Sequence, residues 1–350
     1  MKIIFFGSSE YCLPILDSLL KNFQLLTVVT KQASAAQQFA KLHNIAVFTP
    51  KDKKGLLELK DQISSLEPDL AIVADYGLII PEEIFEIPKV KTLNIHFSRL
   101  PALRGPSPVQ FTILTGEKSA WITVIIMAKE MDMGDIIWQK EVPLDSGKST
   151  NYPINKLSNQ QIGETTGSLY KKLFNIIALE LPDIVNKYIK GEIKPQKQDH
   201  SKATYTKILT REDGYIPPDL INAAMNGLPA TIEQLGKWIL IKQLSSQLTI
   251  NNYQLSIERA IRAFTPWPGV WTIISLIKGR KDTSDGGEAT TSTPPRWRDQ
   301  NNRRLKILKV HLASQGETLQ GKLILDLVQL EGKNPVSWKQ FKEGYPNFTF

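Results

Sequence analysis

Over the first 190 residues, short continuous apolar runs alternate with longer segments that have the periodicity of a helix. Continuous apolar runs are typical of strands buried on both faces, because a half-exposed strand would alternate polar and apolar residues. Strands separated by helices predict a mostly parallel sheet that helices cover on both faces, which is an α/β fold. The expected strands are residues 2–6, 25–30, 46–48, 70–74, 92–96 and 122–128.

In a Rossmann-like sheet of this kind, ligands bind at the carboxyl ends of the strands. The turn after the first expected strand reads FFGSSEY and has one glycine, Gly7, whereas a dinucleotide site has three spaced glycines. We therefore expect Gly7 to allow a tight turn, with Ser8 or Ser9 as a helix cap. A dinucleotide cofactor is not expected.

Composition and pattern change after residue 190, which predicts two domains. A helix over 167–190 closes the first domain, 1–190, and the polar, proline-containing residues 191–207 predict a linker. Short strand-like runs then predict a smaller β-rich domain over 208–350. Within it, residues 278–302 are poor in apolar side chains and predict a loop. Nucleic-acid contact and a solvated insertion are both open for that loop.

The charge balance and the single cysteine limit the class of protein. The chain has 43 Lys and Arg against 35 Asp and Glu, a net charge of +8. This surplus permits a polyanionic partner such as RNA, and it also fits charge spread over the surface for solubility. Cys12 is the one cysteine and the four histidines are scattered, so neither a disulfide framework nor a metal site is expected. We expect a cytoplasmic protein with no membrane span, in which Cys12 is a small buried apolar residue.

Two polar residues close the expected strand at 92–96. Side chains alternate along a strand, so Asn94 and His96 face the same way, at the sheet edge where sites gather. The next segment, 97–108, has several prolines and a glycine, which predict a stiff loop able to present backbone groups to a ring system. A lone histidine is more often structural than catalytic, and with Asn94 beside it both interpretations are open.

A carboxylate follows the next expected strand. If the end of the strand at 122–128 lies at the same sheet edge as the end of the strand at 92–96, Asp132 lies beside His96. There the carboxylate would orient the imidazole and favour the charged form of the ring. Asp132 and Asp135 could instead cap a turn. The sequence has no nucleophile elbow, so Asn94, His96 and Asp132 suit direct acyl transfer, with Asn94 and His96 stabilising an oxyanion.

At these residues the sequence resembles the N10-formyltetrahydrofolate-dependent formyltransferases. The family's Asn-x-His is matched by Asn94 and His96, and its Asp-x-Gly-Asp by Asp132, Gly134 and Asp135. The spacing between His96 and Asp132 also agrees with the family pattern. The resemblance implies a formyltransferase domain in which Asn94, His96 and Asp132 are catalytic, N10-formyltetrahydrofolate is the formyl donor and no metal is used.

The family's Ser-Leu-Leu-Pro folate loop has a counterpart in this chain. It appears as Ser98, Arg99, Leu100 and Pro101, with Arg99 in place of the usual leucine. The resemblance implies that these four residues bind the folate. Because such contacts are largely made by backbone, we expect the folate contact to survive if the Arg99 side chain points outward.

The second half resembles the branch of the family that formylates the methionine carried by initiator tRNA. The segments that show this resemblance are ATYTKILTREDGYI at 203–216, IRAFTPWPGVWT at 261–272 and the terminal LVQLEGKNPVSWKQFKEGY. The resemblance covers nearly the whole chain and implies an OB-like C-terminal domain that binds initiator Met-tRNA. We expect the protein to be a monomer.

One departure concerns how tRNA is held. In well-known bacterial members a basic, glycine-containing loop follows the second strand, whereas here only Lys31 lies in that turn. The acceptor-stem contact is therefore expected to be weaker or made differently. Two alternatives remain open, a formyltransferase acting on a nucleotide-linked amino sugar and an inert RNA-binding protein that has kept the fold.

Overall fold

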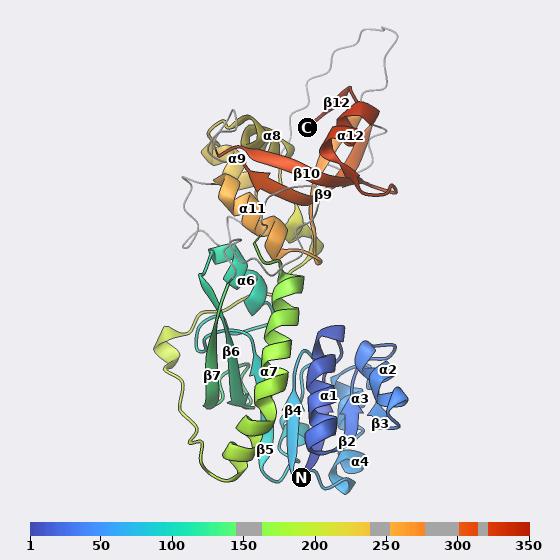
Figure 1. Cartoon of the computed structure of the whole chain (residues 1–350), viewed down its shortest axis with the longest axis vertical. Helices are drawn as coiled ribbons and strands as arrows, with labels where there is room; N and C mark the ends of the chain where they lie inside the picture. The colour runs from blue at the N-terminus through green and yellow to red at the C-terminus, as the bar shows by residue number, and fades with distance from the viewer. Residues whose placement is uncertain (145–162, 239–252, 277–300, 314–320) are drawn as a thin grey trace. The chain divides into compact units, whose positions relative to one another are not determined.

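The computed structural model describes residues 1–144, 163–238, 253–276, 301–313 and 321–350. Nearly all of the expected loop at 278–302 lies outside these residues. The chain forms two compact units (Figure 1). The first contains most of the residues up to Ile208, and the second consists mainly of Leu209–Phe350.

The first unit is built on a sheet that has seven strands among the described residues, in the order β3-β2-β1-β4-β5-β6-β7. The pairs from β3 to β5 are parallel, whereas β6 is antiparallel to β5 and β7 to β6. The mostly parallel, Rossmann-like sheet predicted from the apolar runs is thus confirmed, with an antiparallel end that was not predicted. The strands are β1 Lys2–Phe6, β2 Gln24–Val29, β3 Ala46–Phe48, β4 Leu70–Val73, β5 Lys91–His96, β6 Ser119–Ile126 and β7 Ile136–Pro143.

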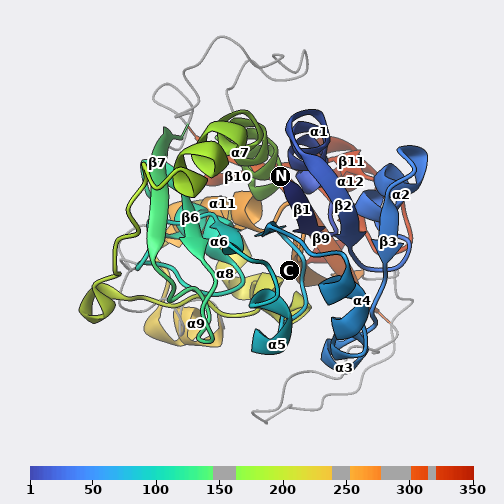
Figure 2. The same cartoon turned by 90° about the horizontal axis from the view of Figure 1, so that it is seen from below.

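Helices cover both faces of this sheet (Figure 2). On one face lie α1 (Leu13–Asn22) and α7 (Thr166–Ile189), joined by a 2.6 Å hydrogen bond from Ser18 Oγ to the Ala178 carbonyl. The other face packs against α3, α4 and α5 through a cluster that includes Phe6, Val73 and Phe85. The remaining helices up to residue 208 are η1 Glu10–Cys12, α2 Ala35–Leu42, α3 Lys53–Leu57, α4 Lys60–Ser65, α5 Glu82–Phe85, α6 Pro108–Thr115 and η2 His200–Lys202.

The second unit has an antiparallel sheet with five strands in its described part, in the order β11-β10-β9-β8-β12. The predicted β-rich C-terminal domain is confirmed. Its helices were not predicted, because the strand-like runs dominate the sequence pattern. The IRAFTPWPGVWT segment forms the end of α11, a turn and the start of β8. The elements are η3 Arg211–Gly214, α8 Pro218–Asn226, α9 Ile232–Lys237, α11 Tyr253–Ala263, β8 Val270–Leu276, β9 Asn302–Leu312, β10 Leu323–Leu330, β11 Val336–Ser337, α12 Trp338–Gly344 and β12 Phe348–Thr349.

The turn after β1 is tight, as expected. A side chain on Gly7 would lie 2.6 Å from a backbone oxygen just past β4, which is closer than atoms can approach. The predicted cap is confirmed in position but not in its hydrogen bond. Ser9 stands at the cap position of η1 without a capping bond, while Ser8 Oγ donates to Tyr76 O at 3.1 Å and accepts from Lys31 N at 3.2 Å. Ser8 therefore joins the turns that follow β1, β2 and β4.

Candidate active site

His96 lies at the carboxyl end of β5 and is 7% exposed. Its Nε2 is 3.0 Å from the Leu103 carbonyl oxygen, which can only accept a hydrogen bond, so Nε2 carries a proton. The other ring nitrogen, Nδ1, faces Oδ2 of Asp132 at 3.6 Å. This places a carboxylate against the second ring nitrogen.

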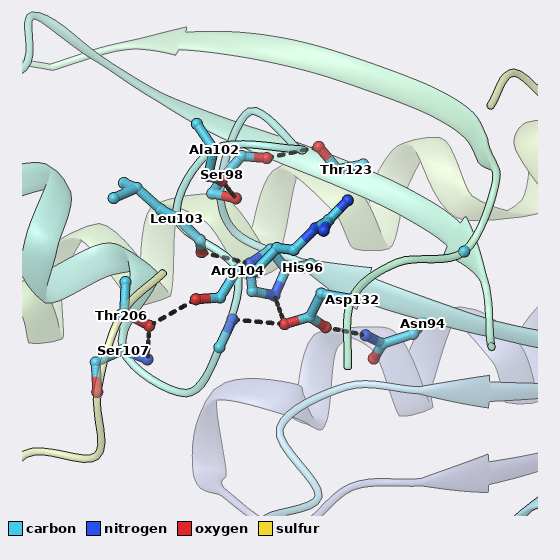
Figure 3. Close-up of polar contacts among 12 residues, drawn as sticks. Asn94, His96, Ser98, Ala102, Leu103, Arg104, Ser107, Thr123, Asp132 and Thr206 are labelled. Carbon is cyan, nitrogen blue, oxygen red and sulfur yellow. Dashed lines mark hydrogen bonds and ion pairs between the residues drawn. The ribbon is translucent and has the colours of Figure 1, made fainter. Parts of the chain in front are cut away.

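The Asp132 carboxylate is bound on three sides (Figure 3). Besides the His96 ring, its Oδ2 accepts a 2.7 Å bond from the Gly105 N–H, and its Oδ1 lies 3.4 Å from Asn94 Nδ2. Asp132 itself has a left-handed backbone with φ of 57°, which is uncommon for a residue with a side chain. Asn94, His96 and Asp132, singled out in the sequence, thus lie together.

The expected reason for this convergence is wrong. Because β6 is antiparallel to β5, its last residue Ile126 pairs with Leu93, toward the opposite end of β5 from His96. The position of Asp132 beside His96 is therefore not explained by a strand that ends at the same sheet edge. The loop that follows β6, residues 127–135, does so by running back along β5 before β7 begins.

Gly134 makes that loop possible. The loop closes at its base, where Ile126 N–H donates to the Asp135 carbonyl at 2.9 Å. A Cβ atom on Gly134 would lie 1.7 Å from the Ile126 carbonyl oxygen, so no side chain fits there. Glycine is thus required by close packing of two backbone segments, and the position of Asp132 depends on it.

The loop expected to bind folate is anchored through its backbone carbonyls. The Ser98 carbonyl accepts a 2.5 Å bond from Thr123 Oγ1, and the Leu100 carbonyl accepts a 3.0 Å bond from Gln139 Nε2. Ser98 Oγ in turn donates to the Ala102 carbonyl at 2.6 Å. The shape of this loop is therefore set by β6 and β7, which flank it.

Arg99 and Leu100 point in different directions from the same loop. Leu100 is 3% exposed, while Arg99 is exposed, with its guanidinium carbon 4.6 Å from the centre of the Trp121 ring. Pro101 follows in a cis peptide bond. Arg99 thus lies on the surface. This is the condition under which we expect the backbone of the loop to contact the folate without interference from the Arg99 side chain.

Sequence reasoning missed a segment that supports the site. Residues 196–206, within the expected linker, pack in the first unit against the loop at 103–107. Arg104 N–H donates to the Thr204 carbonyl at 2.8 Å, and Thr206 N–H donates to the Arg104 carbonyl at 2.7 Å. Polar residues without an apolar pattern carry no signal for such a contact, which only the folded chain reveals.

Two kinds of feature are not found among the described residues. Within those ranges, no group of three or more His, Cys, Asp or Glu residues is placed to hold a metal ion. The described helices also include none that is both long and apolar enough to cross a membrane.

The sequence matches known formyl-transferring proteins. The family model described as "Formyl transferase" matches residues 1–162. Methionyl-tRNA formyltransferase from Roseiflexus castenholzii is 29% identical over 362 residues, covering 98% of this chain and 96% of the relative. Methionyl-tRNA formyltransferase from Chloroflexus aurantiacus is 30% identical over 303 residues, covering 82% of each.

A solved structure agrees with this fold. A 4-N formyltransferase from Francisella tularensis superposes with a TM-score of 0.52 at 17% identity, covering 77% of this chain and 91% of that one, which is a likeness of fold alone. Sheet, site and sequence match together define the class, and the chain is a formyltransferase. Its relatives define the particular group, since the chain belongs to the methionyl-tRNA formyltransferase family.

Proposed function

We propose that this enzyme transfers the formyl group of N10-formyltetrahydrofolate to the free amino group of methionine on initiator Met-tRNA, as a monomer in the cytoplasm. The observation that carries the proposal is the meeting of Asn94, His96 and Asp132 at one point of the first unit. Direct acyl transfer to an amine needs groups that stabilise the oxyanion and a group that accepts the amine proton. The amide, the imidazole and the carboxylate supply them, and none of the three has to form a covalent intermediate.

The reaction begins when the methionine nitrogen attacks the formyl carbon. The C=O electrons move to oxygen, and the Asn94 amide donates to the resulting oxyanion while a charged His96 stabilises it. Asp132 takes the proton that the attacking amine must lose, directly or through a water molecule. The tetrahedral intermediate then collapses, the bond to N10 breaks and the proton taken up by Asp132 is returned to N10 of the folate.

The four residues Ser98, Arg99, Leu100 and Pro101 are proposed to hold the folate next to this centre. Their backbone is fixed by hydrogen bonds from Thr123 and Gln139, so little conformational entropy is lost when a ring system binds. The folate contacts are proposed to come from main-chain groups of the loop.

The acceptor is inferred from relatives and charge. The relatives that cover most of this chain are named methionyl-tRNA formyltransferases, and a net charge of +8 suits a polyanionic substrate. A nucleotide-linked amino sugar is the alternative, which the short turn between β2 and α2 would favour. The likeness to the 4-N formyltransferase from Francisella tularensis does not extend to the acceptor, because it is a likeness of fold alone.

Incubation with N10-formyltetrahydrofolate and Met-charged initiator tRNA tests the proposal directly. The expected product is formyl-Met-tRNA, measured by acid gel electrophoresis of the charged tRNA. A parallel reaction with a nucleotide-linked amino sugar should give no formylated sugar. Formylated sugar without formyl-Met-tRNA would show that the acceptor is wrong while the formyl chemistry is right.

A further inference from the structure

The Gln198 side chain uses its entire hydrogen-bonding capacity between two parts of the active site. Its Oε1 accepts from Arg104 Nε at 3.2 Å and from Nη2 at 2.6 Å. Its Nε2 donates to the Asp132 carbonyl and to the Gly134 carbonyl, both at 2.7 Å. Only one amide orientation satisfies these four bonds, because a guanidinium only donates and a carbonyl only accepts.

The guanidinium at one end of this bridge is buried. Arg104 is 0% exposed, and no carboxylate in the described part of the chain lies within ion-pair distance of it. Its other partners are neutral, the Tyr205 hydroxyl at 3.3 Å and His200 Nδ1 at 2.9 Å. A buried charge without acceptors is costly, so Arg104 holds the Gln198 oxygen firmly and thereby fixes the amide.

The backbone at the other end of the bridge has a demanding conformation. Asp132 has a φ of 57°, a left-handed conformation that is uncommon for a residue with a side chain. The Gln198 amide binds the carbonyl of this same residue and the carbonyl two residues further on. Gln198 thus binds the backbone of the 132–134 turn, while the Asp132 carboxylate faces His96.

We propose that Gln198 is a positioning residue for formyl transfer. It couples the buried Arg104 to the 132–134 turn, and so sets where the Asp132 carboxylate stands relative to His96. Gln198 binds the backbone of the turn, at the Asp132 and Gly134 carbonyls, so its effect on the reaction comes through the position of Asp132. This inference rests on the proposed catalytic role of Asp132.

Gln198→Glu separates the two ends of the bridge. An ionised glutamate keeps acceptor oxygens for Arg104 and adds an ion pair, so the variant is expected to fold, with a lower melting temperature because its second oxygen faces two carbonyl oxygens. It cannot donate to the Asp132 and Gly134 carbonyls, which releases the turn. A displacement of about 1 Å in a catalytic group lowers the rate by ~10²-fold. We expect kcat to fall by that order, with KM for folate and Met-tRNA within about twofold of wild type because binding is untouched.

Two further variants make the measurement decisive. Asn22→Asp is the matched control, since Asn22 also donates through its amide, in an exposed 2.8 Å bond to the Ser18 carbonyl of α1, and it should leave kcat unchanged. Gln198→Met adds no charge but removes the acceptor of Arg104 together with the donors to the turn, so it repeats the kcat test at a lower stability if the glutamate variant does not fold, with circular dichroism reporting the folded state.

The outcomes distinguish this inference from the proposed function. A wild-type kcat in Gln198→Glu, with Asp132→Asn inactive, would overturn the role of Gln198 and leave the catalytic assignment intact. A raised KM with unchanged kcat would also overturn it, because Gln198 would then act in binding. Normal turnover by Asp132→Asn would instead overturn the catalytic assignment on which the inference rests.

Discussion

At the scale of single residues, the charge of Asp132 can be separated from its place in the fold. In Asp132→Asn the amide oxygen can still accept from the Gly105 N–H, which binds the carboxylate at 2.7 Å, so the loops stay joined. The negative charge beside His96 and the proton acceptor for the amine are both lost. We expect kcat for formyl transfer to fall by at least ~10²-fold, as for loss of a general base. Single-turnover formylation assays measure this effect.

The affinity for tRNA supplies the control for Asp132→Asn. Because the change is confined to the catalytic centre, the dissociation constant for Met-tRNA should stay close to the wild-type value. Asp17→Asn removes an exposed carboxylate that pairs with Lys21 on α1, and it should not alter kcat. A large loss of turnover in Asp17→Asn as well would mean that the assay responds to general changes of charge.

The reactivity of the Cys12 thiol depends on its burial. It is 0% exposed, and burial raises the pKa of its thiol from 9.0 to about 12. Because folding favours the neutral thiol, its contribution to stability is fully present below pH 9 and is lost as the pH rises toward 12. We expect iodoacetamide at pH 8 to leave the native chain unmodified and to label it after unfolding. Rapid labelling of the native protein, followed by mass spectrometry, would contradict this burial.

The residues proposed to be catalytic could be singled out from the sequence, and the residues that support them could not. Asn94 and His96 alternate on one short strand, so a local rule brings them to the same face. Asp132 was expected beside them for a reason that the antiparallel β6 removes. Gln198 contacts Asp132 from 66 residues away, and nothing local marks a glutamine in a polar stretch as a partner of a buried arginine.

At the scale of elements, the 127–135 loop depends on glycine at position 134. In Gly134→Ala the methyl group would lie 1.7 Å from the Ile126 carbonyl, so the base of the loop must open. We expect kcat to fall by ~10²-fold as Asp132 moves, and the free energy of unfolding to fall by about 1–3 kcal/mol, as for overpacked sites. Formylation kinetics and urea unfolding measure the two effects.

A second glycine in the same unit provides the matched control. A Cβ on Gly55, in α3, would have its nearest neighbour at 3.7 Å, which is ordinary contact. Gly55→Ala is therefore expected to keep full activity and to leave stability unchanged or slightly raised. If Gly134→Ala behaved like Gly55→Ala, the close approach of the two backbones would not control the loop.

The elements themselves show which patterns are reliable. The strands of the parallel region were predicted closely, because continuous apolar runs report burial on both faces. The helices α8 and α11 of the second unit were missed, since the neighbouring apolar runs resemble strands and no capping pattern was read there. Strand direction was also beyond prediction, because an apolar run looks the same in β5 and in the antiparallel β6.

At the scale of the whole molecule, the turn between β2 and α2 limits how tRNA is held. It spans residues 30–34, and Lys31 is its one basic residue, as the sequence indicated. We therefore expect long-range attraction between the net charge of +8 and the phosphates to supply much of the affinity for tRNA. Attraction of this kind is screened by salt, which makes it measurable.

Binding of Met-tRNA should weaken steeply as salt is raised. Each phosphate contact releases counterions, so three contacts to a duplex lose about 40-fold in affinity between 50 and 200 mM salt, and further contacts lose more. Filter binding or fluorescence anisotropy over this range gives the slope of log K against log salt concentration. Asp132→Asn should show the same slope as the wild type, because the catalytic carboxylate does not contact phosphate. A slope near zero would show that the basic surplus serves solubility, and that tRNA is held by apolar and neutral contacts.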